Sequence, residues 1–311
     1  MNFVIKKLGT LLLTLLVLSF LAYAAFEMVG DPVNQILGTN ASPEDVAALR
    51  QQLGLDKPLL VRYIRWLTGF LGMDMGTSYI YRIPVSEMIG DKLGVTVILT
   101  LMGFALTLMF SIPLGVYGAR REGSWADRGM TVINQIVMAV PAFFVAILLM
   151  VFFGVVLRIF TPGSFVPMKE SLGRFLLYMI FPALSIAIPR TAMTAKMLRS
   201  SILGEMQKDY VRTAYSRGHN RQTALRSHAL KNSLLPVVSF MASTMAEMLA
   251  GCIVIEQIFT IPGIGRLLMV SISNRDIPVV EAIVMILALW VMLVHFIGEV
   301  INEMLDPRLR V

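Results

Sequence analysis

Ionisable residues inside apolar stretches are the first place where this sequence could do chemistry. Arg190, Glu247 and His295 each lie within a long run of apolar residues. Because charged side chains are costly in a bilayer, they usually face a cavity, an ion-pair partner or a transport path. We therefore take these three residues as candidates for a translocation path.

Each candidate also has a structural alternative. Arg190 could serve a cavity or gate, pair with Glu247, or extend its long side chain to the membrane surface. Glu247, near the middle of its run, fits either a cavity wall or a buried ion pair. For His295 a packing role is as reasonable as a ligand role.

Enzymatic chemistry has little support in the sequence. A phosphate-binding G-x-x-x-x-G-K-[ST] loop is absent. The only other histidines are His219 and His228, and neither they nor Cys252 belong to a metal-binding pattern. The 22 methionines are spread through the apolar runs, where methionine is chiefly a filler. We expect no catalytic residue, no metal site and no cofactor in this chain.

A long polar stretch, residues 198–236, separates two apolar ones. Residues 202–215 show a helical pattern, and Gly218 separates them from a second helical run, residues 221–230, that leads to Pro236. Two short helices joined at a glycine could enter a groove of a partner protein. The alternative is a loop held against anionic lipid headgroups. The basic residues of the stretch are Arg199, Lys208, Arg212, Arg217, Arg221, Arg226 and Lys231.

Composition places the chain in a membrane. Of its 311 residues, 56% are apolar and 15% charged, and the mean hydropathy is +0.73. This leaves too little polar surface for a soluble globule of this size. The net charge of +7 could suggest nucleic-acid binding, but basic loops give membrane proteins the same signature. We therefore exclude nucleic acid as a partner.

The apolar runs predict an all-α protein with six transmembrane helices. Residues 1–29 hold the first, which we expect to remain uncleaved because only Ala22-Tyr-Ala24 offers a weak processing site. Residues 93–305 form the transmembrane permease domain with five further spans, and each run is expected to cross the membrane once. These five spans are expected at about 93–119, 129–157, 175–197, 234–258 and 277–301.

Polar segments connect and flank these spans. Residues 30–92 are expected outside the membrane on the extracytoplasmic side, with a short helix from Pro43 to about Leu53 that is capped by Ser42 and ended by Gly54. Residues 198–233 form a loop, and residues 306–311 form a tail. Lys and Arg concentrate in the short loops and at both ends of the chain, which predicts that the loop and both termini are cytoplasmic.

Several motifs resemble one family, the permeases of ATP-binding cassette importers, in the branch that takes up peptides or nickel. Asp209-Tyr-Val-Arg-Thr-Ala214-x-x-x-Gly218, His228-Ala-Leu-Lys-Asn232 and Leu235-Pro236 look like that branch's cytoplasmic coupling loop. The general motif has Glu-Ala-Ala where this chain has Arg212-Thr213-Ala214, and the glycine-to-proline spacing is longer than in sugar permeases. The further signatures, in the order the family expects, are Gly30-Asp-Pro-Val33, Leu53-Gly-Leu-Asp-Lys-Pro-Leu59, Met75-Gly-Thr-Ser78 with Pro84-Val85, Ile258-Phe-Thr-Ile-Pro-Gly-Ile-Gly265, Asn274-Arg-Asp-Ile-Pro-Val279 and Leu305-Asp-Pro-Arg-Leu-Arg310.

The resemblance implies a type I importer permease in a bacterial inner membrane. It implies a second similar permease, two ATPases that bind ATP and Mg²⁺, and an extracytoplasmic substrate-binding protein. Residues 27–92 and 259–277 would face that binding protein, and the family's E-x-I-F pattern gives Glu256 a structural role. The coupling residues would enter an ATPase cleft and move the spans between inward-open and outward-open states. Carried over from the motif, these residues are Asp209, Tyr210, Arg212, Thr213, Ala214, Gly218, His228, Asn232 and Pro236.

The substrate is less constrained than the family. We expect short peptides, with nickel or a nickel chelate as the alternative, because Ala246-Glu247-Met248 and the short 158–175 loop look compatible with nickel members. A secondary transporter working alone is a different class of function. Such proteins normally show internal repeats or broken helices, and the sequence shows neither.

Overall fold

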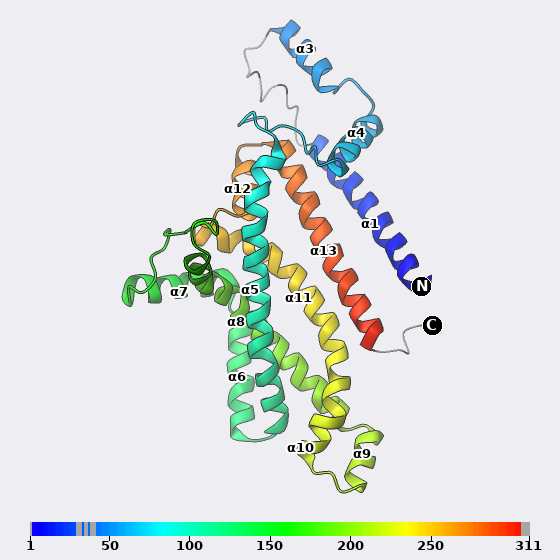
Figure 1. Cartoon of the computed structure of the whole chain (residues 1–311), viewed down its shortest axis with the longest axis vertical. Helices are drawn as coiled ribbons and strands as arrows, with labels where there is room; N and C mark the ends of the chain where they lie inside the picture. Colours follow the sequence, from blue (N-terminus) through cyan, green and yellow to red (C-terminus); the bar gives the residue numbers. More distant parts are fainter. Residues whose placement is uncertain (1, 29–32, 34–36, 38–41, 306–311) are drawn as a thin grey trace. The chain divides into compact units, whose positions relative to one another are not determined.

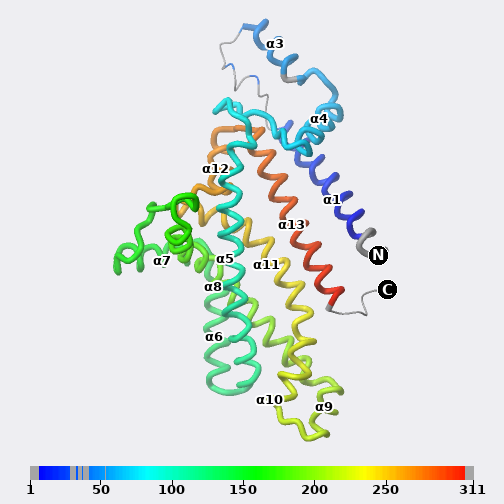
Figure 2. Tube along the Cα trace, viewed as in Figure 1, coloured from blue at the N-terminus to red at the C-terminus, as the bar shows by residue number. Residues whose placement is uncertain are grey.

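A computed structural model describes residues 2–28, 33, 37 and 42–305 (Figures 1 and 2). The Gly30–Pro32 part of the first signature and the predicted tail, 306–311, lie outside the described residues. The named helices are α1 (Asn2–Glu27), α3 (Pro43–Leu53), α4 (Leu59–Leu71), α5 (Val85–Arg120), α6 (Trp125–Ala139), α7 (Ala142–Leu149), η1 (Met150–Val156), α8 (Leu172–Met206), α9 (Asp209–Ser216), α10 (Arg221–Ala224), η2 (Leu225–Ala229), α11 (Leu230–Ile258), α12 (Ile264–Ser273) and α13 (Ile277–Leu305).

The prediction of an all-helical membrane protein is confirmed. Among the described residues, five helices are long and apolar enough to cross a membrane, and a sixth span exists if the bent pair of α6 with α7 and η1 is counted as one. Helix α8 has 35 residues and is therefore roughly 50 Å long, well beyond the ~30 Å hydrocarbon core. Its last turns must extend out of the membrane.

The third expected span, residues 129–157, is not one straight helix. The two halves, Trp125–Ala139 and Ala142–Val156, meet at an angle of 97°. Pro141 has no backbone N–H and forces the preceding Val140 into an extended conformation, with φ −87° and ψ 122°. The expectation that the chain contains no broken helix is therefore wrong.

The short helix outside the apolar runs is confirmed. Helix α3 starts at Pro43, and the Ser42 hydroxyl accepts a hydrogen bond from the Asp45 N–H at 3.1 Å. It ends at Gly54, whose φ of 70° is left-handed, and the Gly54 N–H returns to the last turn. Local capping chemistry is sufficient to set both ends.

The chain divides into two compact units, and the first comprises Met1–Val95 and Pro262–Met292. Here an aromatic cluster joins α1 to α4, with ring centroids 5.2 Å apart for Phe20 and Tyr63 and 5.5 Å apart for Tyr23 and Trp66. The Ser19 hydroxyl lies 2.7 Å from the Tyr63 hydroxyl. These contacts hold α4 against the end of α1.

A buried carboxylate fixes the loop that precedes α5 in the same unit. Asp276, which is fully buried, accepts hydrogen bonds from the Ser78 hydroxyl and from the Tyr79 N–H. Burial raises the pKa of Tyr79 to about 12, and the carboxylates of Glu281, Glu27 and Asp276 add to the effect. Tyr79 therefore stays neutral at physiological pH.

The second unit comprises Thr96–Ile261 and Leu293–Val311, and α8 and α11 pack together at its centre. The buried side chains of Leu198, Ile202 and Leu225 form a core with their neighbours at one end. Towards the other end of α11, Glu256 is fully buried and accepts a hydrogen bond from Thr96. These contacts are consistent with the structural role expected of Glu256.

Candidate functional site

Helix α9 carries most of the predicted coupling residues and is separate from α8. The expected helix over 202–215 is interrupted, because α8 ends at Met206 and Lys208 is extended, with φ −74° and ψ 153°. Val211 and Ala214 are buried, whereas Asp209, Arg212 and Thr213 are exposed. The helix therefore packs by one face and presents the other to its surroundings.

The turn after α9 is left-handed at Gly218. Its φ is 88°, and its N–H donates to the Tyr215 carbonyl at 2.9 Å. A Cβ atom at Gly218 would have no neighbour within 4 Å, so only the backbone conformation calls for glycine there.

The second short helix is also different from the expectation. Residues Arg221–Ile258 form one continuous helix, so the segment after the turn is the start of a membrane span. Asn220 caps it by accepting a hydrogen bond from the Thr223 N–H at 2.9 Å. His228 lies in the π-helical segment η2, with Asn232 and Pro236 further along α11. The segment that connects the two long helices therefore runs only from residue 207 to residue 220, which is much shorter than the predicted loop 198–233.

Hydrogen bonds join α9 to both long helices. Glu205 on α8 accepts from Lys208 Nζ at 2.5 Å and from the Tyr210 hydroxyl at 2.6 Å. The Asn232 amide on α11 donates to the same Tyr210 oxygen at 3.2 Å. Burial raises the pKa of Tyr210, and its bond to Glu205 raises that pKa further, so the hydroxyl keeps its proton. Tyr210 therefore bridges α8, α9 and α11.

A second set of ionic contacts surrounds the α5–α6 turn, which lies at the same end of this unit as α9 (Figure 1). Arg199 donates two hydrogen bonds to Asp127, from Nε and Nη2, both at 2.7 Å. Arg221 pairs with Glu122. Asp127 also accepts from the Gly123 N–H at 3.0 Å, while its own N–H donates to the Ser124 hydroxyl at 3.2 Å.

Sequence reasoning did not select Glu122 or Asp127. The Ser124-x-x-Asp127 spacing is a helix-capping pattern that could have drawn attention to Asp127. Nothing local pointed to Arg199, which is 72 residues away.

The structure brings two of the three translocation candidates together. Arg190 on α8 forms an ion pair with Glu247 on α11. The Glu247 side chain is 59% exposed and Arg190 is 25% exposed, so the pair lies at the surface of the chain and is not a buried pair. His295 on α13 is exposed, and none of its described contacts joins it to that pair.

Comparison with known proteins now gives this geometry a context. Residues 111–311 match the family model described as "Binding-protein-dependent transport system inner membrane component", and residues 1–100 match the N-terminal model of the same membrane component. A Brucella abortus (strain 2308) protein, provisionally named a peptide transport system permease protein, is 34% identical over 308 residues, covering 99% of this chain and 98% of that protein. The glutathione transport system permease protein of Salmonella paratyphi A is 34% identical over 313 residues, covering 100% and 99%.

The matches extend over both units and include α9, the α5–α6 turn and the Arg190–Glu247 pair. Proteins of such systems work with an ATPase and a substrate-binding protein. The apolar helices and the family together make this a multi-pass protein of a bacterial inner membrane. The chain belongs to the family of inner membrane components of binding-protein-dependent transport systems, as a permease of the ATP-binding cassette importers.

Proposed function

We propose that this chain is a transmembrane subunit of an ATP-driven importer of short peptides. It would act with a second permease, two ATPases and an extracytoplasmic binding protein. Both termini and α9 lie on the cytoplasmic side in this proposal, in keeping with the basic loops. ATP and Mg²⁺ are bound by the ATPases, and this chain carries no catalytic residue.

The placement of α9 is the observation that carries the proposal. Its exposed face, with Arg212, Thr213 and the 39%-exposed Tyr215, is free to occupy a groove of an ATPase. Its other face is buried at Val211 and Ala214, and hydrogen bonds through Tyr210 link α9 to α8 and α11. Closure of the ATPases then moves α9 and both long helices together, which changes access to the substrate path.

The substrate class is supported by the relatives. One carries a name from a peptide transport system and the other from a glutathione transport system, and glutathione is itself a peptide. Both align over nearly the full length of this chain. Short peptides are therefore the substrate we propose, and nickel or a nickel chelate remains the alternative.

Removal of this chain is expected to abolish peptide uptake. In a strain lacking the gene, uptake of radiolabelled trialanine should fall to background, whereas uptake of radiolabelled nickel should persist. Restoring the gene on a plasmid should restore peptide uptake. Loss of nickel uptake alone would reverse the choice of substrate. Trialanine uptake by the purified chain alone in liposomes would instead point to a secondary transporter.

The Arg190–Glu247 pair is our candidate for the wall of the substrate path. An ion pair with an exposed carboxylate is costly against lipid, but it is stable against a water-filled cavity or the partner permease. Glu247→Gln should lower ATP-driven uptake several-fold and leave the amount of folded protein unchanged, while Glu303→Gln on α13 serves as the control. Full uptake by Glu247→Gln would assign the pair a purely structural role.

A further inference from the structure

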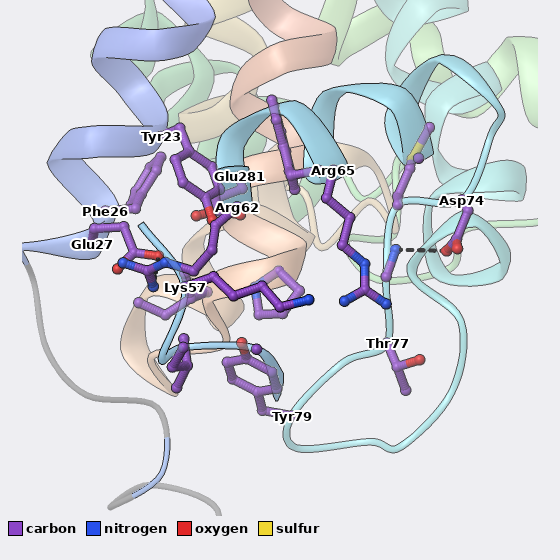
Figure 3. A pocket seen from close by; sticks show the side chains of 18 of the residues that line it. Tyr23, Phe26, Glu27, Lys57, Arg62, Arg65, Asp74, Thr77, Tyr79 and Glu281 are labelled. Carbon is purple, nitrogen blue, oxygen red and sulfur yellow. Dashed lines mark hydrogen bonds and ion pairs between the residues drawn. The ribbon is translucent and has the colours of Figure 1, made fainter. Parts of the chain in front are cut away.

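A cavity of about 780 Å³ opens in the first unit (Figure 3). Residues of α1, α3, α4, the loop before α5 and the start of α13 line it, and all of them belong to this one unit. Its volume is in the range of small-molecule sites. Tyr23, Phe26, Trp66 and Tyr79 supply aromatic surface to its wall.

Two cations share one corner of this cavity. A Cβ atom placed on the buried Gly54 would lie 3.6 Å from Arg65 Nη1 and 4.0 Å from Lys57 Cδ. Figure 3 shows the Lys57 side chain extending towards Arg65. Neither side chain forms an ion pair with any carboxylate among residues 42–305, and Arg82 adds a third positive charge to the wall. Like charges this close favour the binding of an anion.

Carboxylates also line this cavity, with Asp74 on the side of Arg65 and with Glu27 and Glu281 on the opposite side (Figure 3). Glu27 is already paired with Arg62 at 2.6 Å, and Asp74 accepts a hydrogen bond from the Gly76 N–H at 3.0 Å. Glu281, in the first turns of α13, has no ion pair with a described cation and is shown near Tyr23 and Arg62 in Figure 3. The cavity therefore offers a cationic corner and an acidic group, separated within one aromatic-walled space.

This arrangement matches the ends of a free peptide. We infer that the cavity binds a short peptide, with its terminal carboxylate on Lys57 and Arg65 and its ammonium group towards Glu281. Arginine and lysine bind carboxylates through charge-assisted hydrogen bonds, and the aromatic rings cover the peptide's apolar groups. The inference rests on the proposed peptide import, to which it adds a binding site in the permease itself.

The test uses the purified permease–ATPase complex without its binding protein, titrated with trialanine by calorimetry. The wild-type complex should bind trialanine saturably and bind trialanine amide at least about tenfold more weakly. The Lys57→Met/Arg65→Met double variant should also bind trialanine at least about tenfold more weakly, whereas Arg50→Met, on α3 but outside the cavity wall, should bind normally. Glu281→Gln should weaken binding of trialanine but not of N-acetyl-trialanine.

The outcomes separate this site from the import proposal. If the wild-type complex binds no trialanine yet imports it once the binding protein is added, the site is refuted and import stands. If it binds trialanine but never imports it, import is refuted and the site stands. The double variant could instead keep its affinity for trialanine and lose affinity for the binding protein. That result would refute the peptide site and would show that Lys57 and Arg65 contact the binding protein. Unchanged thermal unfolding of the double variant shows that it is folded.

Discussion

Gly218→Val is expected to reduce ATP-driven uptake by about fivefold to a hundredfold. Strain at such a backbone position is about 1–3 kcal/mol, and 1.4 kcal/mol corresponds to a factor of ten. The φ of 88° at Gly218 is unfavourable for a β-branched residue. The turn would then rearrange, and α9 would lose its orientation on α8 and α11. Uptake in proteoliposomes with the ATPases and the binding protein is the measurement.

Gly218→Asn is the matched control, because asparagine tolerates left-handed conformations. It should keep most of the uptake. Since no atom lies within 4 Å of the Cβ position, the Cβ atom of neither variant meets a neighbour, and a difference between the two variants is expected to report backbone conformation. Equal and full uptake in both variants would contradict the coupling role of this turn. ATP hydrolysis that continues without uptake in the valine variant would be direct evidence of uncoupling.

Asp127→Asn is expected to lower the free energy of unfolding by about 2–3 kcal/mol, because it removes a charge-assisted pair of hydrogen bonds and leaves a half-buried guanidinium without its anion. The Asp127 side chain is only 5% exposed, and both bonds to Arg199 are 2.7 Å long. Denaturation of the purified protein in detergent measures the change. Because this pair ties the α5–α6 turn to the end of α8, uptake should fall as well.

Glu122→Gln provides the comparison at the same turn. Glu122 and Arg221 are 42% and 49% exposed, and exposed pairs contribute only about 0–1 kcal/mol. A double-mutant cycle with Arg199→Met should give a large coupling energy for Asp127 and a much smaller one for Glu122, whose charge also acts on Arg199 but which makes no hydrogen bond to it. Equal effects of Asp127→Asn and Glu122→Gln on stability would show that burial does not set the strength of the Arg199 pair.

Features set by neighbouring residues could be predicted from the sequence. Ser42, Pro43 and Gly54 define both ends of α3 because capping depends on the groups within one helical turn. The apolar runs likewise indicated the membrane helices, since span length follows from bilayer thickness. The break at Pro141 was also readable from a local rule, but the continuous hydrophobicity on both sides of the proline concealed it.

Features made by distant residues could not be predicted in this way. The Asp127–Arg199 pair and the Ser78–Asp276 contact each join segments far apart in the sequence. The cavity is assembled from residues between Tyr23 and Glu281. The pairing of Arg190 with Glu247 was one of several open alternatives, because only packing of α8 on α11 could select it.

The two prolines within α8 have a mechanical consequence. Pro182 and Pro189 each remove a backbone hydrogen bond from a helix that is otherwise continuous from Leu172 to Met206. Bending stiffness is lowest where the bond ladder is interrupted, so a force applied at the Met206 end acts on a rigid lever arm with its pivot near Pro189. That pivot is adjacent to Arg190. A push on α9 would thus be converted at the pivot into a tilt of the Arg190 side chain against Glu247.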